Sequence, residues 1–125
     1  MAGMRIGYAI SNPTLIKYLN DAKYSFNSYT MNQTSLVCGV EAVKDKAYFE
    51  ECVNKIIETR EWAKEGLKNL GFHCLDSKSN FIFAMHPDYD AKELFEALKE
   101  NDIYVRFWGS ERIEQYMRIT VGTRE

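Results

Sequence analysis

Two arginines near opposite ends of the 125-residue chain have the clearest capacity for chemistry. Arg5 lies in the run Met-Arg-Ile-Gly-Tyr-Ala-Ile, and Arg118 lies in the run Tyr-Met-Arg-Ile-Thr-Val-Gly. A guanidinium presents a planar fork of hydrogen-bond donors that suits a carboxylate or a phosphate. We therefore predict that both side chains bind anions, and the alternative for each is a solvent-exposed arginine on an edge strand.

The apolar alternation around both arginines predicts that each lies on a β-strand. In the first run Arg5 would share a face with Gly7 and Ala9, whose small side chains leave space for a ligand. In the second run Arg118 would point away from Met117 and Ile119, which we expect to lie in the core. The hypothesis requires the two guanidiniums to converge on one crevice.

The elements that must position these arginines alternate between helix and strand. Apolar spacing and end signals predict helices over residues 13–23, 32–44, 46–70 and 91–100, with a break near Asp45 and Gly71 as a C-cap. Strands are predicted over residues 72–75, 80–85 and 103–107, in addition to the two arginine strands. The spacing places Arg60 in the buried stripe of the third helix. This order predicts an α+β fold, with a small, mostly antiparallel sheet packed against helices.

Composition bounds the class of protein. A chain of this length with 46% hydrophobic and 14% aromatic residues is long enough for one packed core. Sixteen basic and eighteen acidic residues give a net charge of -2, which predicts that the chain does not bind nucleic acid. No apolar run reaches the roughly 18 residues that a membrane span needs, so we expect no membrane association.

Cysteines and histidines do not form a recognisable metal site. Cys38, Cys52 and Cys74 lack metal-ligand spacing and are interpreted as reduced, mostly buried thiols of a cytoplasmic protein. His73 and His86 are isolated from each other and are expected to be ordinary strand-end or loop residues, so no metal is predicted.

Four segments, in order, carry a resemblance to a known family. They are Ala2-Gly3-Met4-Arg5-Ile6-Gly7-Tyr8, Phe26-Asn27-Ser28-Tyr29, Ser79-Asn80-Phe81-Ile82 and Arg118-Ile119-Thr120-Val121-Gly122-Thr123-Arg124-Glu125. Together they resemble the C-terminal third of pyridoxal-phosphate-dependent aminotransferases of the aspartate aminotransferase fold. The most similar branch is that of the histidinol-phosphate aminotransferases.

The resemblance implies roles for individual residues. Arg5 would contact the phosphate of the cofactor, Arg118 would bind the substrate's anionic group, and Asn80 would support Arg118. Arg106, in a segment similar to the family's Ile-x-Val-Arg, would help to shape the substrate pocket, or would face solvent. Residues 1–31 would be a remnant of the large cofactor-binding domain, and residues 32–125 would form the interdomain helix and the small C-terminal domain.

The family's Schiff-base lysine lies eight residues before the phosphate-binding arginine, which is before residue 1 here, so no catalytic residue is predicted in this chain. We expect a fragment, inactive by itself, of a dimeric cytoplasmic enzyme of histidine biosynthesis. That enzyme would act on histidinol phosphate and 2-oxoglutarate with pyridoxal phosphate. The alternatives are a related branch for aromatic amino acids or threonine phosphate, and a free-standing α+β domain that binds anions or a partner.

Overall fold

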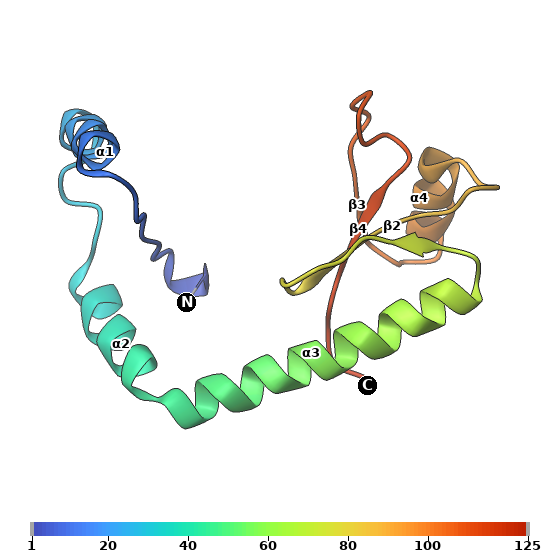
Figure 1. Ribbon diagram of the computed structural model, residues 1–125, viewed down its shortest axis with the longest axis horizontal. Helices are drawn as coiled ribbons and strands as arrows, with labels where there is room; N and C mark the ends of the chain where they lie inside the picture. The colour runs from blue at the N-terminus through green and yellow to red at the C-terminus, as the bar shows by residue number, and fades with distance from the viewer. Residues whose placement is uncertain (1, 125) are drawn as a thin grey trace. The chain divides into compact units, whose positions relative to one another are not determined.

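The computed structural model describes residues 2–124, which fall into two compact units (Figure 1). Met1–Glu50 form the helical unit and Glu51–Glu125 form the sheet unit. The elements in chain order are η1 (Ala2–Met4), α1 (Pro13–Phe26), α2 (Gln33–Lys44), α3 (Lys46–Asn69), β1 (His73–Cys74), β2 (Phe81–Met85), α4 (Ala91–Glu100), β3 (Arg106–Phe107) and β4 (Met117–Thr120). The predicted α+β class is confirmed.

Local end signals define the helices of the helical unit. The side chain of Asn12 accepts a hydrogen bond from the N–H of Leu15 at 3.0 Å, and Pro13 occupies the first turn of α1. Asn32 caps α2 in the same way through the N–H of Ser35 at 2.7 Å. The predicted start and end of α2 are therefore confirmed to within one residue, whereas α1 continues three residues beyond the predicted end at residue 23.

The prediction that Arg5 lies on a strand is wrong. Arg5 follows the short η1 turn with a φ of 57°, in the left-handed region, and residues 6–12 form no strand. Alternating apolar residues need a neighbouring strand to complete a ladder, and the sheet described in this chain contains only elements of the sheet unit. The predicted shared face of Arg5, Gly7 and Ala9 therefore does not form.

The predicted break between the second and third helices is confirmed at Asp45. Its backbone N–H donates to the carbonyl of Glu41 at 3.0 Å, which closes α2. Its side chain accepts a hydrogen bond from the N–H of Tyr48 at 3.1 Å, which caps the first turn of α3. One residue thus ends one helix and starts the next.

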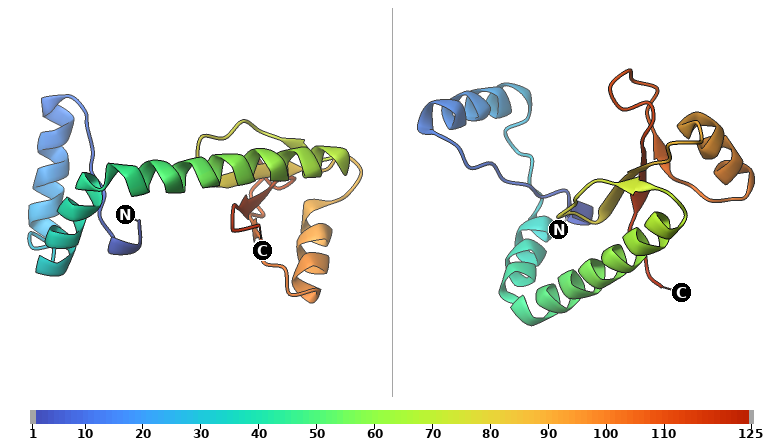
Figure 2. Two further views of the ribbon diagram at one scale, coloured as in Figure 1. Left: turned by 90° about the horizontal axis from the view of Figure 1, so that it is seen from below. Right: turned by 45° about the vertical axis from the view of Figure 1, so that its right-hand side comes forward.

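Four antiparallel strands in the order β1-β2-β4-β3 form the sheet of the sheet unit. Along β2 burial alternates, and Ile82 and Ala84 are fully buried on one face. Ala84 and Phe107 are both paired with Met117 of β4, so these side chains share that face, where Phe107 stacks on Phe95 of α4 at 5.7 Å. Within this unit α4 therefore packs against β3 on the core side of the sheet (Figure 2).

Helices α3 and α4 both end within the sheet unit, and their ends form the same motif. At the end of α3 the N–H of Gly71, whose φ is 90°, donates to the carbonyl of Lys68, and the N–H of Phe72 donates to Leu67. At the end of α4 Asp102, with a φ of 60°, takes the position that Gly71 has in α3. The N–H of the following Ile103 bonds back to α4. For this reason the predicted strand 103–107 is reduced to Arg106–Phe107.

His86 directly follows β2, as predicted, and in addition completes the end of α3. It is 8% exposed, and its Nδ1 accepts a hydrogen bond from the N–H of Asp88 at 3.1 Å. Nε2 therefore carries the proton and donates to the carbonyl of Leu70 at 3.0 Å.

The cysteine prediction needs a correction. Cys38 is exposed, and Cys52 and Cys74 are half-buried, so none of the three is fully buried. The interpretation failed because the helix faces that carry Cys38 and Cys52 are partly open to solvent. All three are free thiols. Among residues 2–124 no helix combines the length and the apolar character that crossing a membrane requires.

Candidate anion-binding site

Arg118 lies in the middle of β4 on the face of the sheet opposite to the core. Its register partner on β2 is Phe83 and its register partner on β3 is Arg106. Directly opposite residues of antiparallel strands project to the same face. One row across this face therefore consists of a phenylalanine and two arginines.

Two aromatic rings contact the guanidinium of Arg118. Its central carbon lies 4.1 Å from the centroid of the Phe81 ring and 5.3 Å from that of the Trp108 ring. Both distances fall within the range of cation–π attraction, which orients a guanidinium without neutralising its charge. The positive charge thus remains available to a ligand.

The donors of Arg118 have no hydrogen-bond partner in the part of the chain that the structure describes. Its Nε is buried and has no hydrogen-bond partner, and within residues 2–124 no carboxylate forms an ion pair with its guanidinium. An unsatisfied donor on a half-buried cation is costly, because the group has lost water without gaining an acceptor. The arrangement is that of a site that a bound anion would complete.

Arg106 adds a second cation beside the first. Its side chain is exposed, and its guanidinium carbon lies 5.4 Å from the centroid of Trp108. In the described part of the chain it, too, has no acidic partner. Two neighbouring guanidiniums without a carboxylate favour an anion of charge -2, such as a phosphate, over a single carboxylate.

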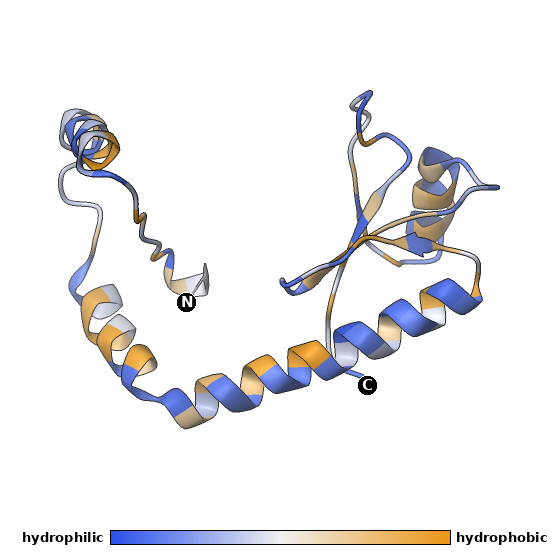
Figure 3. Ribbon diagram, in the orientation of Figure 1, coloured by the Kyte–Doolittle hydropathy of each residue, from blue (hydrophilic) through white to orange (hydrophobic). Residues whose placement is uncertain are grey.

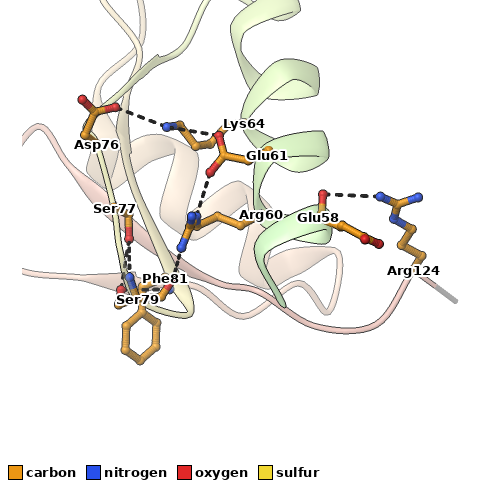
Figure 4. A network of polar contacts seen from close by, with 9 residues as sticks. All are labelled: Glu58, Arg60, Glu61, Lys64, Asp76, Ser77, Ser79, Phe81 and Arg124. Carbon is orange, nitrogen blue, oxygen red and sulfur yellow. Dashed lines mark hydrogen bonds and ion pairs between the residues drawn. The ribbon is translucent and has the colours of Figure 1, made fainter. Parts of the chain in front are cut away.

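A network of polar contacts holds the start of β2, which carries Phe81 (Figure 4). Arg60 of α3 is 6% exposed and donates from Nη1 to the carbonyl of Ser79 at 2.9 Å. The N–H of Phe81 donates to the hydroxyl of Ser79 at 3.2 Å. The prediction that Arg60 lies on the buried face of its helix is confirmed, and its polar head is satisfied by the β1–β2 loop.

Lys64, one turn further along α3, reinforces the same connection. Its ammonium lies 3.4 Å from Asp76 in the loop and 3.6 Å from Glu61. Glu61 also accepts a hydrogen bond from Nε of Arg60 at 2.9 Å, and this bond is the main reason that the pKa of Glu61 lies below its usual value. Because both cations are occupied by these partners, we assign them to structure and not to ligand binding.

Asn80 contributes to the sheet through its backbone. Its carbonyl accepts a hydrogen bond from the N–H of Val121 at 2.9 Å, which extends the pairing of β2 with β4. Its side chain is exposed and makes no hydrogen bond to Arg118 among residues 2–124. The support of Arg118 by the Asn80 side chain stays a prediction.

Arg5 belongs to the helical unit, so its convergence with Arg118 also stays a prediction. Its side chain is exposed, and in residues 2–124 it forms no ion pair. The left-handed backbone of a residue with a Cβ costs about 1–2 kcal/mol, and such conformations are frequent at ligand-binding positions. Next to Arg5 in sequence, Ile6, Gly7 and Tyr8 line an apolar groove with Val43 and Phe49.

The sequence interpretation missed the two rings that contact Arg118. No functional role was predicted for Trp108, and Phe81 was included only as part of the segment Ser79-Asn80-Phe81-Ile82. The period-2 spacing of Arg106 and Trp108 was the available signal, because it places both side chains on one face. What the sequence could not supply was the register that brings Arg106 opposite Arg118.

Residues 1–125 match the family described as Aminotransferase class I and II. The chain belongs to this family. A histidinol-phosphate aminotransferase from Brachyspira hyodysenteriae is 52% identical over 125 residues, and enzymes of that name from Lactococcus lactis and from Clostridium botulinum (strain Okra) are 45% and 44% identical. In each case the match covers 100% of this chain and 35% of the relative, so the chain spans about a third of their length.

A solved structure shows the same fold. It is a crystal structure from Erwinia carotovora atroseptica of a protein provisionally named histidinol-phosphate aminotransferase. The match has a TM-score of 0.80 at 22% identity and covers 98% of this chain and 34% of that one. The chain therefore has the fold of about a third of the Erwinia protein.

Proposed function

We propose that this chain supplies the substrate-anion site and a cofactor-phosphate contact of an aminotransferase that acts on histidinol phosphate and 2-oxoglutarate in histidine biosynthesis. The observation that carries the proposal is Arg118. Its buried Nε has no hydrogen-bond partner among residues 2–124, and its guanidinium contacts the rings of Phe81 and Trp108. The shared name of relatives that are 44–52% identical supports the same substrate class.

Arg118 would bind the phosphate of the substrate through its fork of donors, and Arg106 would add the second positive charge. A phosphate at pH 7 carries between one and two negative charges, which matches two cations better than the single carboxylate of an aromatic amino acid would. Asn80 would support the guanidinium of Arg118. This charge balance favours a phosphorylated amino donor over the aromatic branch of the family.

The cofactor is pyridoxal phosphate, the group that this family of aminotransferases uses, and Arg5 would bind its phosphate. The exposed guanidinium of Arg5 has no acidic partner among residues 2–124 and so fits an anionic group. When bound, pyridoxal phosphate supplies an electron sink for bond breaking at the substrate's α-carbon. The arginines of this chain bind and orient the two phosphates, and no residue of the chain is assigned to proton transfer.

We propose further that the complete enzyme is a cytoplasmic homodimer in which residues 1–31 belong to the cofactor-binding domain and residues 32–125 to the small domain. The boundary at residue 50/51 between the two compact units differs from this division. Both divisions separate Arg5 from Arg118.

The decisive test is amino transfer by the full-length protein. We expect transfer of the amino group from histidinol phosphate to 2-oxoglutarate, with weaker activity on aromatic amino acids and threonine phosphate. A preference for an aromatic donor would move the protein to another branch of the family. If the full-length protein transferred an amino group from none of these donors while the 125-residue chain bound anions saturably, the alternative of an anion-binding domain would be favoured.

Replacement of Arg118 with lysine tests the substrate-binding role. Lysine keeps the charge but loses the planar fork, and one charge-assisted hydrogen bond contributes about 1.5–3 kcal/mol. We expect KM for histidinol phosphate to rise by about 10- to 100-fold, while the melting temperature stays close to that of the wild type. An unchanged KM would remove Arg118 from the site.

Replacement of Arg5 with glutamine tests the cofactor-binding role separately. We expect the full-length variant to lose pyridoxal phosphate on dialysis more readily than the wild type, with little change in the apparent affinity of the Arg118 site. Equal retention of the cofactor in both proteins would contradict the role of Arg5.

A further inference from the structure

Trp108 contacts both arginines of the candidate site. We propose that Trp108 is a positioning residue, whose indole ring holds the guanidiniums of Arg106 and Arg118 together as one site for a doubly charged anion. This inference rests on the proposed function, because it concerns the arginine to which we assign the substrate's phosphate.

The two arginines carry like charges, which repel each other. Arg106 and Arg118 are register partners on β3 and β4, and directly opposite residues of antiparallel strands lie about 4.5–5.5 Å apart at their Cα atoms. Like charges in such a pair destabilise a sheet. In residues 2–124 no carboxylate pairs with either guanidinium, so the usual compensation is lacking.

The indole ring provides another compensation. The guanidinium carbons of Arg106 and Arg118 lie 5.4 Å and 5.3 Å from its centroid, nearly equal distances that fall inside the roughly 6 Å range of cation–π contacts. Tryptophan has the strongest attraction for cations among the aromatic side chains. One ring can therefore hold two like charges near each other until an anion binds.

The ring itself is braced by neighbours on the same face of the sheet. Phe83 meets Trp108 edge to face, with centroids 6.2 Å apart, and stacks on Tyr116 at 4.7 Å. The brace restricts the indole, so the guanidiniums are held before the anion arrives. Pre-organisation of this kind raises affinity because less freedom is lost on binding.

An NMR titration of the 125-residue chain with inorganic phosphate tests the inference, with the Nε–H signals of the arginines as the readout. In the wild type we expect the signals of Arg106 and Arg118 to shift together with one Kd. The test variant is Trp108→Leu, which keeps an apolar side chain but removes the ring, and Trp108→Phe restores a smaller ring. The matched control is Phe95→Leu, which removes an aromatic contact from the other face of the sheet.

We expect the Kd of Trp108→Leu to rise by about tenfold, with Trp108→Phe between it and the wild type and Phe95→Leu unchanged. Melting temperatures measured in parallel separate this effect from loss of folding, and Trp108→Met replaces Trp108→Leu if the latter does not fold. Unchanged binding by the leucine variant, equal weakening by Phe95→Leu, or no joint shift in the wild type would each overturn the inference. Failure of the proposed function would give a different result, because the full-length protein would bind phosphate but transfer no amino group.

Discussion

The sheet unit and the helical unit differ in where their stability can come from. Every apolar side chain that is buried in residues 2–124 lies in the sheet unit, namely Ile82, Ala84, Ala91 and Met117. In the described part of the helical unit the buried residues are Ser35 and Gly39. Hydrophobic burial is the main favourable term in folding, so cooperative unfolding of this chain should report on the sheet unit.

The helical unit keeps its helices through local signals. Asparagine caps begin α1 and α2, but α1 buries no residue, and large apolar side chains such as Ile10 and Phe26 are 88% and 94% exposed. Figure 3 shows that much of α2 is hydrophobic, and its Leu36, Val40 and Val43 are exposed. Apolar exposure on this scale marks a surface for further protein, in line with relatives about three times as long.

The largest expected contrast comes from replacing one isoleucine with alanine in each unit. Ile82→Ala removes a fully buried side chain and should lower the free energy of unfolding by about 2–5 kcal/mol. Ile10→Ala, at an exposed position of the helical unit, should change it by less than about 0.5 kcal/mol. Urea titration followed by tryptophan fluorescence measures both, and an equal loss for Ile10→Ala would end the distinction between the units.

A backbone position in the sheet unit gives the next largest effect. Gly71 has a φ of 90°, and a Cβ added there would lie 2.7 Å from Nε2 of His86, the atom that caps Leu70. Gly71→Ala should therefore destabilise the sheet unit by about 2–3 kcal/mol. Its control is Gly66→Ala, inside α3, where a Cβ would meet nothing within 4 Å and should stabilise by about 0.5–1 kcal/mol. If thermal unfolding showed stability changes of the same sign for Gly71→Ala and Gly66→Ala, the assignment of this helix end would be contradicted.

The equivalent position of α4 predicts a change in the opposite direction. Asp102 adopts a φ of 60° in the motif that Gly71 occupies in α3. Asp102→Gly relieves this backbone strain in the folded state but increases the entropy of the unfolded chain. The net result should be a rise in the free energy of unfolding of up to about 1 kcal/mol. Asp102→Ala, which keeps the Cβ, should bring no gain, and a similar gain from both variants would show that strain is not the cause.

The smallest expected effect depends on pH. The Asp90 side chain accepts hydrogen bonds from the N–H groups of Lys92 and Glu93 at 2.9 and 3.1 Å, and the bond from Glu93 is the main reason that its pKa lies below the usual 3.8. A lowered pKa in the folded state means that the contribution is present above pH 3.8 and is lost as the pH falls below it. Asp90→Ala should therefore be less stable than the wild type at pH 7, and the difference should shrink in acid.

The matched control at this cap is Asp90→Asn, which keeps the acceptor oxygen without the titrating charge. Thermal unfolding of this variant should show a smaller dependence on pH than the wild type. A wild-type-like acid dependence in Asp90→Asn would assign the titration to another group.

Much of the fold could be predicted from the sequence because its signals are local. Apolar spacing, the break near Asp45 and Gly71 predicted α2, α3 and α4 closely, and alternation predicted β2 and β4. The segment around Arg5 carried an equally clear alternation but no strand forms there. A strand depends on a neighbour for its hydrogen bonds, and periodicity within one segment carries no information about that neighbour.

The candidate site was predictable in its residue types but not in its contacts. Guanidinium chemistry and the family resemblance pointed to Arg118. The contacts of Phe81 and Trp108 with it depend on the order β2-β4-β3 and on a register that pairs Arg106 with Arg118. Pairing between strands that are distant in sequence follows from tertiary packing, so the local patterns of the sequence do not reveal it.

The hydrogen bond from Arg60 to the carbonyl of Ser79 links α3 to the region around Arg118. Ser79 precedes by two residues the phenylalanine whose ring supports Arg118. A change in α3 that withdraws this one donor would free the start of β2 and loosen the floor beneath the guanidinium. If Arg118 binds an anion as proposed, Arg60 would influence the affinity of the site without touching the ligand.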